Sequence, residues 1–551
     1  MIGKPLQALV AALLISATAT AVGGPQITTD AGIIEGTEEK GIMRFLGVRY
    51  AAAPEGELRW RPPQPVEPWE GVRDKTSYGH PCPQPFGGYP DWATDPMREA
   101  GLDEDCLTIN IWAPADAGDE PLPVMFYIHG GNMYYGSNVM PLYDGSDLAS
   151  KGVVAVFINY RLGYLGRFAH PALSRLQADE PLMNYGTMDQ IAALDWVQRN
   201  IAQFGGDPDN VTIYGHSAGG VSVNYLMTTP QSEGLFHKAI AQGSGVLLDR
   251  DPHMTESFPR GIIGYSGEQV GELFARRFNI SGSDEEVAAA LRAVSWQDII
   301  AYQKELMVPF NPFVDGKVVT KDLVQVFEDG EQHDVPYIGG ANSWEQSAID
   351  PIPFIGRWFM AGAFLAGMDD DDLAPFDDQW TRVGVSDRWY AEGLFLLSTR
   401  HLARQMSTVS SPAWQFRVTY IPTAARGEVP GAPHGQEMPW LFGQIEEHPE
   451  YQRPKIIADT PASDEDLKWG NTLQAYWLNF AKTGNPNGPG LPEWPQYTPE
   501  NDLTLEMNAQ FEPVSGLDKD ALDYLEERAM IRRERLDALE QPGQLLPPPE
   551  D

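Results

Sequence analysis

The chain has 551 residues, of which 42% are hydrophobic and 11% aromatic, so it can bury a large core and is not an intrinsically disordered protein. Asp and Glu outnumber Lys and Arg by 77 to 39, which gives a formal net charge of −38. A surface this acidic repels phosphate groups, which excludes nucleic acid as the main partner. The length leaves the number of domains open, because an α/β enzyme with long insertions can carry this many residues on one sheet.

The first 21 residues have the pattern of a secretory signal. Lys4 precedes the apolar run LQALVAALLIS, and the small residues that follow suit cleavage near Ala19 or Ala21. The competing interpretation is a membrane anchor, but the run is short for a bilayer and no later apolar segment is long enough. We therefore expect a secreted or periplasmic protein without a stable membrane anchor.

Export makes the two cysteines informative. An oxidising compartment favours a disulfide, so Cys82 and Cys106 are predicted to pair, the alternative being two unpaired thiols. Closing a loop of this size stabilises a fold by about 3 kcal/mol in the chain-entropy model.

Short runs rich in β-branched and aromatic residues recur along the chain and alternate with helices or turns. They read as buried strands of one mixed sheet and lie at 123–128, 152–158, 210–214, 237–242, 334–340 and 413–420. Residues 188–204 carry apolar side chains at helical spacing and end at a GGDP turn. This alternation predicts an α/β fold with helices packed on a central sheet.

The remaining segments are less specific. Residues 356–397 have helical character, and the run MDDDDL at 368–373 is expected to be a solvated acidic loop or helix start, with a calcium site as the alternative. Residues 517–540 predict one exposed amphipathic helix, and 541–551 a flexible tail.

A serine flanked by glycines follows the strand 210–214. The motif Gly215-His216-Ser217-Ala218-Gly219 stands between that strand and an apolar stretch that can continue as a helix. A nucleophile elbow holds its serine in a strained backbone and needs small residues two positions before and after it. Gly215 and Gly219 meet that demand, so Ser217 is the predicted nucleophile, an ordinary glycine turn being the alternative.

A second glycine motif, His129-Gly130-Gly131, follows the strand 123–128. Glycines there let the backbone approach a ligand and present consecutive N–H groups, as an oxyanion hole requires. We assign this hole to the N–H groups of Gly130, Gly131 and Ala218, and we expect His129 to position the loop. A plain turn after a strand is the alternative.

His216 is adjacent to Ser217 in sequence, which raises the question of whether it is the base. In an elbow the residue before the nucleophile points away from it, into the protein beneath. We therefore predict that His216 is buried and hydrogen-bonded, supports the elbow and influences the local charge, and that the base lies elsewhere.

These motifs, taken together, resemble the type-B carboxylesterase family of α/β-hydrolases. The resemblance covers nearly the whole mature chain through blocks in the family's order, among them FLGVRYAAAP, EDCLTINIW, NYRLGYLG, GHSAGG, GANSWEQS, PHGQEMPWLFG and FAKTGNPN. It implies an α/β-hydrolase fold: a large mixed, mostly parallel sheet flanked by helices, with helical insertions forming a cap. Residues 22–540 would form this single domain.

The resemblance also implies the site. By the family pattern Ser217 is the nucleophile, Glu345 of GANSWEQS the acid and His434 of GAPHGQEMPWLFG the base. The cysteine of EDCLTIN, Cys106, is disulfide-bonded in the family to a cysteine upstream, in agreement with the pairing expected from export.

Three departures from the family pattern concern the surroundings of these groups. Trp344 and Gln346 flank the acid where relatives often have Asp and Gly, and Asn132 replaces a third oxyanion glycine. The block Gln242-Gly243-Ser244-Gly245 leaves open whether Ser244 supplies the hydroxyl that usually supports the acid.

The chemistry implied is hydrolysis of a small-molecule carboxylic ester through an acyl-enzyme, with short-chain or aromatic esters expected and no cofactor or metal required. One alternative is a cationic substrate such as a choline ester, because Trp92 lies inside the predicted disulfide loop and the surface is acidic. Another is a non-catalytic binding member of the fold. The sequence does not determine the oligomeric state.

Overall fold

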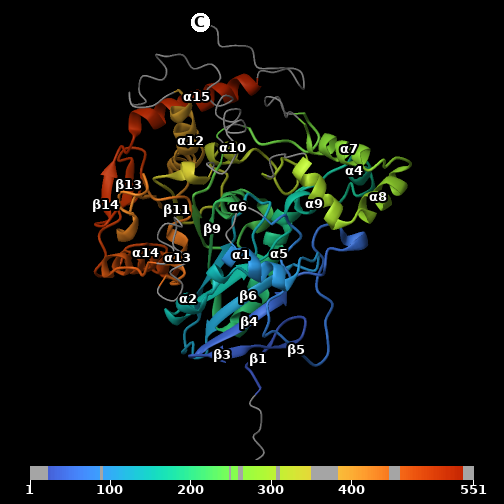
Figure 1. Ribbon diagram of the computed structural model, residues 1–551, viewed down its shortest axis with the longest axis horizontal. Coiled ribbons are helices and arrows are strands. Elements are labelled where there is room, and N and C mark those ends of the chain that lie inside the picture. The colour runs from blue at the N-terminus through green and yellow to red at the C-terminus, as the bar shows by residue number, and fades with distance from the viewer. Residues whose placement is uncertain are drawn as a thin grey trace, which may run out of the picture.

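The computed structural model describes residues 23–86, 91–246, 248, 250–257, 265–305, 311–348, 382–445 and 460–537 (Figure 1). The expected signal segment, the acidic run 368–373 and the tail 541–551 lie outside the described residues.

The centre of the fold is an 11-stranded mixed sheet, counted over those ranges, with strand order β14-β13-β12-β11-β10-β9-β7-β8-β6-β4-β3. From β8 through β7 and β9 to β13 neighbouring strands are parallel, and the strands outside this block pair antiparallel. The strands are β3 Thr37–Glu39, β4 Ile42–Arg49, β6 Thr108–Pro114, β7 Leu122–Ile128, β8 Val154–Ile158, β9 Gly206–His216, β10 Lys238–Gln242, β11 Tyr337–Asn342, β12 Ala413–Val418, β13 Leu503–Met507 and β14 Glu512–Ser515. A small sheet contains β1 Gln26–Thr28, β2 Ile33–Glu35 and β5 Val72–Asp74. The predicted strands coincide with β7 to β12, which confirms the mixed, mostly parallel sheet.

The sheet separates two hydrophobic cores. In β7 the side chains of Val124, Phe126 and Ile128 belong to one core cluster, and those of Met125 and Tyr127 belong to the other. Successive residues of a strand point to opposite faces, so a strand covered on both faces is apolar at every position. This is why the parallel strands read as unbroken apolar runs in the sequence.

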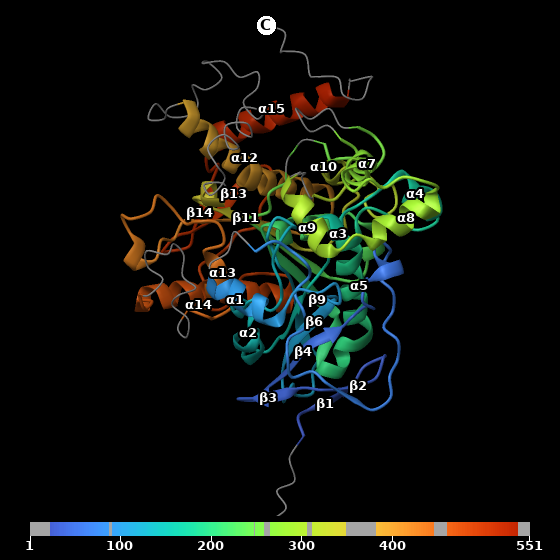
Figure 2. The same cartoon turned by 45° about the vertical axis from the view of Figure 1, so that its right-hand side comes forward.

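Helices cover both faces (Figure 2). On one side lie α1 Asp91–Ala100, α2 Ser146–Ser150, α13 Glu437–Leu441 and α14 Asp464–Thr483, and on the other α5 Tyr185–Asn200 and α6 Ala218–Leu226. Further helices are α3 Gly163–Gly166, α4 Pro171–Leu176, α7 Gly267–Arg277, α8 Asp284–Ala293, α9 Trp296–Glu305, α10 Leu323–Glu328, α12 Arg382–Gln405 and α15 Lys519–Asp537. The predicted helix 188–204 corresponds to α5 and a 3-10 turn, Ile201–Phe204, that ends at Gly205 with φ of 79°.

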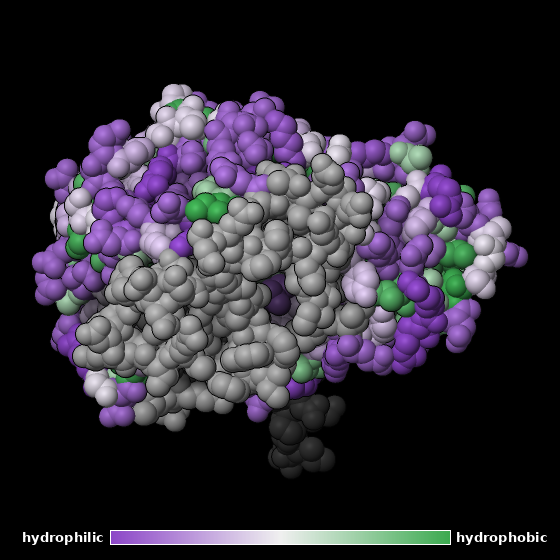
Figure 3. Space-filling view, turned by 90° about the horizontal axis from the view of Figure 1, so that it is seen from above, coloured by the Kyte–Doolittle hydropathy of each residue, from purple (hydrophilic) through white to green (hydrophobic). Residues whose placement is uncertain are grey.

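The C-terminal helix is docked on the rest of the molecule. Leu522 and Leu525 of α15 are buried, with 1% and 2% of their surface exposed, and α15 packs against α12. The prediction of an exposed helix was therefore wrong: the apolar stripe that gave the segment its amphipathic pattern is covered by α12. Seen from above Figure 1, the end of the molecule at which α15 lies, the described part of the surface is mostly hydrophilic (Figure 3).

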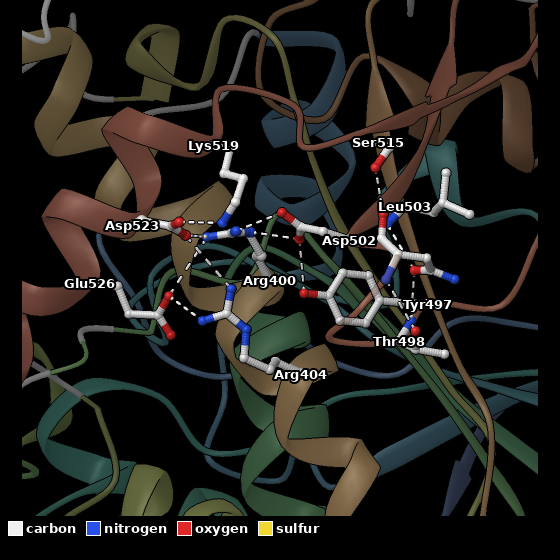
Figure 4. Close-up of polar contacts among 11 residues, drawn as sticks. Arg400, Arg404, Tyr497, Thr498, Asp502, Leu503, Ser515, Lys519, Asp523 and Glu526 are labelled. Atoms are coloured by element: carbon white, nitrogen blue, oxygen red, sulfur yellow. Dashed lines mark hydrogen bonds and ion pairs between the residues drawn. The ribbon is translucent and has the colours of Figure 1, made fainter.

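A cluster of charged side chains, which we call the α12–α15 clamp, joins the two helices to the start of β13 (Figure 4). The Arg400 guanidinium donates to both carboxylate oxygens of Asp502, at 2.9 and 2.6 Å, and lies 2.8 Å from Asp523. Arg404 and His401 bind Glu526 at 2.7 and 2.8 Å. The clamp therefore fixes α12 both to α15 and to the residue that precedes β13 of the sheet.

The predicted disulfide between Cys82 and Cys106 is confirmed, with a Cα–Cα distance of 5.0 Å. Among the helices formed by the described residues, none is both long and apolar enough to cross a bilayer.

Candidate active site

Ser217 stands at the sharp turn between β9 and α6. Its backbone has φ of 57° and ψ of −124°, and its N–H donates to the Gln242 carbonyl of the neighbouring strand at 2.8 Å. A Cβ on Gly215 would lie 2.4 Å from the Gly219 carbonyl carbon, and one on Gly219 would lie 2.0 Å from the Ile128 carbonyl oxygen. Both positions exclude any side chain, so the strand and the helix can meet at Ser217 only with glycines there.

The loop after β7 lies against this turn. A Cβ on Gly130 would lie 2.5 Å from the His216 carbonyl oxygen and 3.1 Å from the Ser217 Cβ. Gly131 has φ of 109°, and its carbonyl accepts from the N–H groups of Tyr134 and Tyr135 at 2.9 and 3.0 Å. Among the described residues, the N–H groups of Gly130, Gly131 and Ala218 donate no hydrogen bond. These three donors can therefore bind an oxygen placed beside Ser217.

His129 supports this loop from within the protein. Its side chain is buried, its Nδ1 donates to the Gly130 carbonyl at 2.8 Å, and its ring stacks on Tyr160 with centroids 4.5 Å apart. Burial lowers the pKa of His129 to about 4, so the imidazole is neutral at physiological pH. The Tyr160 hydroxyl donates to the His129 carbonyl at 2.8 Å, which holds the end of β7.

Glu345 and His434 meet beyond the carboxyl ends of β11 and β12. Glu345 begins the 3-10 turn Glu345–Ala348 that follows β11 and is 1% exposed. One of its carboxylate oxygens accepts from the Asn342 N–H at 2.6 Å, and the other accepts from His434 Nδ1. With Nδ1 carrying a proton, the Nε2 of a neutral His434 has its lone pair free to accept one.

Further contacts fasten the two loops together. Trp344 N–H donates to the Ala432 carbonyl at 2.9 Å, and the His434 N–H donates to the Ser347 hydroxyl at 2.8 Å. Asn342 Nδ2 donates to the Pro433 carbonyl at 2.7 Å. The imidazole orientation is thus set by bonds to the backbone and side chain of His434 alike.

A second carboxylate, Glu437, lies beside this pair. It is buried, accepts from Asn342 Nδ2 at 2.8 Å and from Gln242 Nε2 at 3.2 Å, and starts α13. Burial raises the pKa of Glu437, an effect that the Asn342 hydrogen bond opposes and the charge of Glu345 reinforces. Sequence reasoning missed Glu437, although it lies three residues after His434 in the quoted block.

His216 lies against the predicted base and is less buried than expected. It is partly exposed, and its ring contacts the His434 ring with centroids 4.3 Å apart. A Cβ on Gly243 would lie 3.2 Å from both rings, so glycine there lets the two imidazoles approach. That His216 points away from the Ser217 hydroxyl stays a prediction.

His434 therefore lies next to the Ser217 turn, with the His216 ring as the contact between them. No hydrogen bond between the Ser217 hydroxyl and His434 is found in the described ranges; such bonds are often long before substrate binds. The His434 ring also contacts Phe395 of α12, with centroids 5.0 Å apart. Phe395 was also missed, because nothing in its local sequence marks it.

The remaining candidates lie around the site. Ser244 accepts from Asn224 Nδ2 at 3.1 Å, and the hydrogen bonds found for Glu345 come instead from Asn342 and His434. Trp92 lies on α1, partly buried against the core cluster of that face. Within the ranges the structure covers, no three His, Cys, Asp or Glu side chains converge as metal ligands would.

The disulfide loop is tied to the loop that follows β7. Gln84 Nε2 donates to the carbonyls of Cys82 and Gly136, each at 2.9 Å, and Gly136 N–H donates to Gln84 Oε1 at 2.7 Å. The disulfide therefore restrains the segment that carries Gly130 and Gly131.

Comparison with known proteins agrees with this arrangement. The sequence profile of the Carboxylesterase family matches residues 23–352 and 377–525. Fumonisin B1 esterase of Sphingopyxis macrogoltabida is 33% identical over 500 residues, which span 89% of this chain and 87% of that protein. Para-nitrobenzyl esterase of Bacillus subtilis (strain 168) is 32% identical over 487 residues, spanning 88% and 95%.

Solved structures give the same result. A PNB esterase superposes with a TM-score of 0.77 at 29% identity, covering 91% of this chain and 99% of that one. A carboxylesterase of Geobacillus stearothermophilus superposes with a TM-score of 0.75 at 29% identity, covering 90% and 99%. The chain belongs to the carboxylesterase family, has the α/β-hydrolase fold and is an ester hydrolase.

Proposed function

We propose that the protein is a secreted serine carboxylesterase that hydrolyses short-chain or aromatic carboxylic esters through an acyl-enzyme. Residues 1–21 would be removed on export, 22–540 would form one domain, and 541–551 a flexible tail. Pairing of the two cysteines supports an oxidising destination.

In the first half-reaction the Ser217 hydroxyl attacks the ester carbonyl carbon while His434 Nε2 takes its proton. The N–H groups of Gly130, Gly131 and Ala218 bind the oxyanion of the tetrahedral intermediate. Glu345 accepts from Nδ1 and stabilises the imidazolium. His434 then returns the proton to the departing alkoxide, which leaves as the alcohol and yields the acyl-Ser217 ester.

In the second half-reaction a water molecule takes the place of the alcohol. His434 accepts a proton from this water as its oxygen attacks the acyl carbon, and the same three N–H groups bind the second oxyanion. Collapse breaks the bond to Ser217 Oγ, which recovers its proton from His434, and the carboxylic acid leaves. The complete reaction converts one ester and one water molecule into an alcohol and a carboxylic acid, and it needs no other reactant.

The observation that carries the proposal is the Glu345–His434 hydrogen bond placed beside the strained turn at Ser217. A strained turn and a buried carboxylate that needs dedicated partners are both expected where they serve a function. A non-glycine residue at positive φ costs about 1–3 kcal/mol, and Glu345 is a carboxylate that is 1% exposed. A non-catalytic binding protein would have no need of either, which disfavours that alternative.

The substrate class rests on the relatives. Relatives similar over most of their length include a fumonisin B1 esterase, a para-nitrobenzyl esterase and a cocaine esterase, whose names point to ester substrates. A cationic ester is less well supported, because Trp92 packs against a core cluster. A choline ester whose kcat/KM fell with added salt, while that of p-nitrophenyl acetate did not, would favour it.

Ser217→Ala tests the proposal. The variant is expected to lose about six orders of magnitude in kcat for p-nitrophenyl acetate, because the nucleophile and base act as a unit. The matched control is Ser222→Ala on the same helix, where the hydroxyl accepts from Gln190 at 2.9 Å and has no part in the reaction. An organophosphonate should label the parent protein and the control but not Ser217→Ala. Turnover retained by Ser217→Ala would disprove the assignment.

A further inference from the structure

The side-chain amide of Gln84 pairs with the backbone of Gly136 in the loop that follows β7. Its Nε2 donates to the Gly136 carbonyl at 2.9 Å, and its Oε1 accepts from the Gly136 N–H at 2.7 Å. The second Nε2 hydrogen is donated to the Cys82 carbonyl, also at 2.9 Å. Gln84 is 2% exposed, so water does not compete for these bonds. Because the amide both donates to and accepts from Gly136, it fixes the position and the orientation of that residue.

Gly136 in turn packs against the hydrogen bond between His129 and Gly130. It has φ of 118°, and a Cβ on it would lie 2.4 Å from His129 Nδ1 and 2.5 Å from the Gly130 carbonyl oxygen. His129 Nδ1 donates to that same oxygen at 2.8 Å. The Gly130 carbonyl and the Gly131 N–H belong to one planar trans peptide, in which they point in opposite directions. A shift of Gly136 that turned the Gly130 carbonyl would therefore also turn the Gly131 N–H.

Gln84 is itself held by a rigid part of the fold. It follows Cys82 closely in the chain, and the disulfide joins Cys82 to Cys106, which lies shortly before β6 of the central sheet. Both cysteines are buried. The amide of Gln84 therefore holds Gly136 against a segment that is anchored to the sheet.

A second amide, that of Asn159 after β8, joins the same two segments. Its Nδ2 donates to the His80 carbonyl at 3.1 Å, and its Oδ1 accepts from the Asn138 N–H at 2.7 Å. The segments therefore stay joined when Gln84 is replaced, and we expect the replacement to displace Gly136 without unfolding the loop.

We propose that Gln84 is a positioning residue for the oxyanion hole, acting through Gly136 on the direction of the Gly131 N–H. The inference rests on the proposed function, in which that N–H binds the oxyanion. A donor aimed at the oxyanion stabilises the transition state more than the bound ester. Because the same donor serves both half-reactions, acylation and deacylation should slow together, which lowers kcat and leaves KM nearly unchanged.

The experiment compares Gln84→Leu with Gln198→Leu, with p-nitrophenyl acetate as the substrate. Gln198 is the matched control: its Nε2 also donates to two backbone carbonyls, those of Pro208 at 2.8 Å and Leu235 at 3.0 Å, and Pro208 lies at the end of β9 opposite to Ser217. Rates are expressed per active site labelled by an organophosphonate. Gln84→Leu is expected to lower kcat about 10- to 100-fold with KM within about threefold, and Gln198→Leu to change kcat by less than about twofold.

A second measurement separates positioning from a general loosening of the fold. The carbonyl carbon of trifluoroacetophenone forms a bond to Ser217 Oγ, the hydroxyl proton passes to His434, and the ketone oxygen becomes an oxyanion in the hole. Its Ki should rise in Gln84→Leu by the same factor by which kcat falls. Acetophenone, which binds without forming this bond, should change its Ki by less than about twofold. A merely structural role of Gln84 would lower the melting temperature and leave both inhibition constants unchanged.

Equal losses of kcat in the two leucine variants, or a loss of kcat without a parallel rise in the Ki of trifluoroacetophenone, would overturn the inference. If Gln84→Leu does not fold, Gln84→Asn decides, because it keeps the amide on a shorter side chain. It should lower kcat at least about threefold with an equal rise in that Ki, and an unchanged kcat counts against positioning. Failure of the proposed function looks different: trifluoroacetophenone would bind the parent no more tightly than acetophenone, and Ser217→Ala would keep its turnover.

Discussion

Ser217 keeps a backbone conformation that its own side chain disfavours. The strain is held by the Gln242 carbonyl, which accepts the Ser217 N–H at 2.8 Å, and by the glycines at 215 and 219 that allow β9 and α6 to close on each other. His129 similarly serves the site through its neighbours, since its ring fixes the loop that carries Gly130. At this scale the site depends on small residues and neutral groups that do no chemistry themselves.

The burial of His129 predicts a pH-dependent loss of stability. Its folded pKa of about 4 lies below the unfolded value of about 6.5, so the unfolded chain binds the proton first as the pH falls. The free energy of unfolding contains the full contribution of neutral His129 above pH ~6.5. This contribution declines by up to about 3 kcal/mol as the pH falls to about 4.

Urea unfolding at pH values between 8 and 4 measures this loss in the parent protein and in His129→Asn, whose amide can donate in place of Nδ1. The variant should show a smaller decline by about that amount. At pH 8 the imidazole is neutral in both the folded and the unfolded state. The difference in free energy of unfolding between the variant and the parent at this pH therefore measures the cost of lost packing alone. Parallel pH curves would contradict the prediction.

At the scale of elements, α12 connects the site to the outer layer. Phe395 of this helix packs on the His434 ring, and one to three turns further on Arg400 and Arg404 enter the α12–α15 clamp. Burial acts to raise the pKa of Asp502, but the hydrogen bond and charge of Arg400 outweigh it and hold that pKa below its usual value. A depressed carboxyl pKa contributes stability at neutral pH that is lost as the pH falls through the folded value.

Arg400→Met is expected to destabilise the protein by about 3–5 kcal/mol, because it leaves buried carboxylates without their cation. The control is Arg277→Met, which removes the same charge from an exposed ion pair with Glu305 and should cost under about 1 kcal/mol. Denaturant unfolding at pH 7.5 compares the two variants. Equal losses would mean that the clamp adds nothing beyond a surface pair.

At the scale of the whole molecule, the dominant property is the charge of −38. Like charges over one surface repel and oppose the compact state. Salt shortens the range of this repulsion, from about 30 Å at 0.01 M to several ångströms at 0.5 M. The acidic surface is therefore expected to weaken the fold most at low ionic strength.

Raising NaCl from 0.01 to 0.5 M should raise the melting temperature by several degrees, measured by scanning calorimetry. KCl should give the same shift, because screening depends on ionic strength rather than on the identity of the cation. A melting temperature that stayed constant or fell would show that the charge is already balanced by local ion pairs.

Much of the fold and part of the site followed from local patterns. The strands β7 to β12 were predictable because both of their faces are buried, and the turn at Ser217 because only glycines fit at 215 and 219. Glu345 and His434 were identified through the family blocks, since a loop carboxylate and a loop histidine 89 residues apart carry no local signal that they meet.

The sequence by itself determined the alternation of strand and helix, the strained serine turn, the paired cysteines and the acidic surface, because each depends on residue type and short-range spacing. Only the tertiary structure decided that His216 touches His434, that Glu437 and Phe395 lie beside His434, and that α15 is clamped to α12. These contacts join segments that are distant in the chain. Which side chains meet depends on the space that their packed neighbours leave, and at Gly243 the absence of a side chain leaves space for the two imidazole rings.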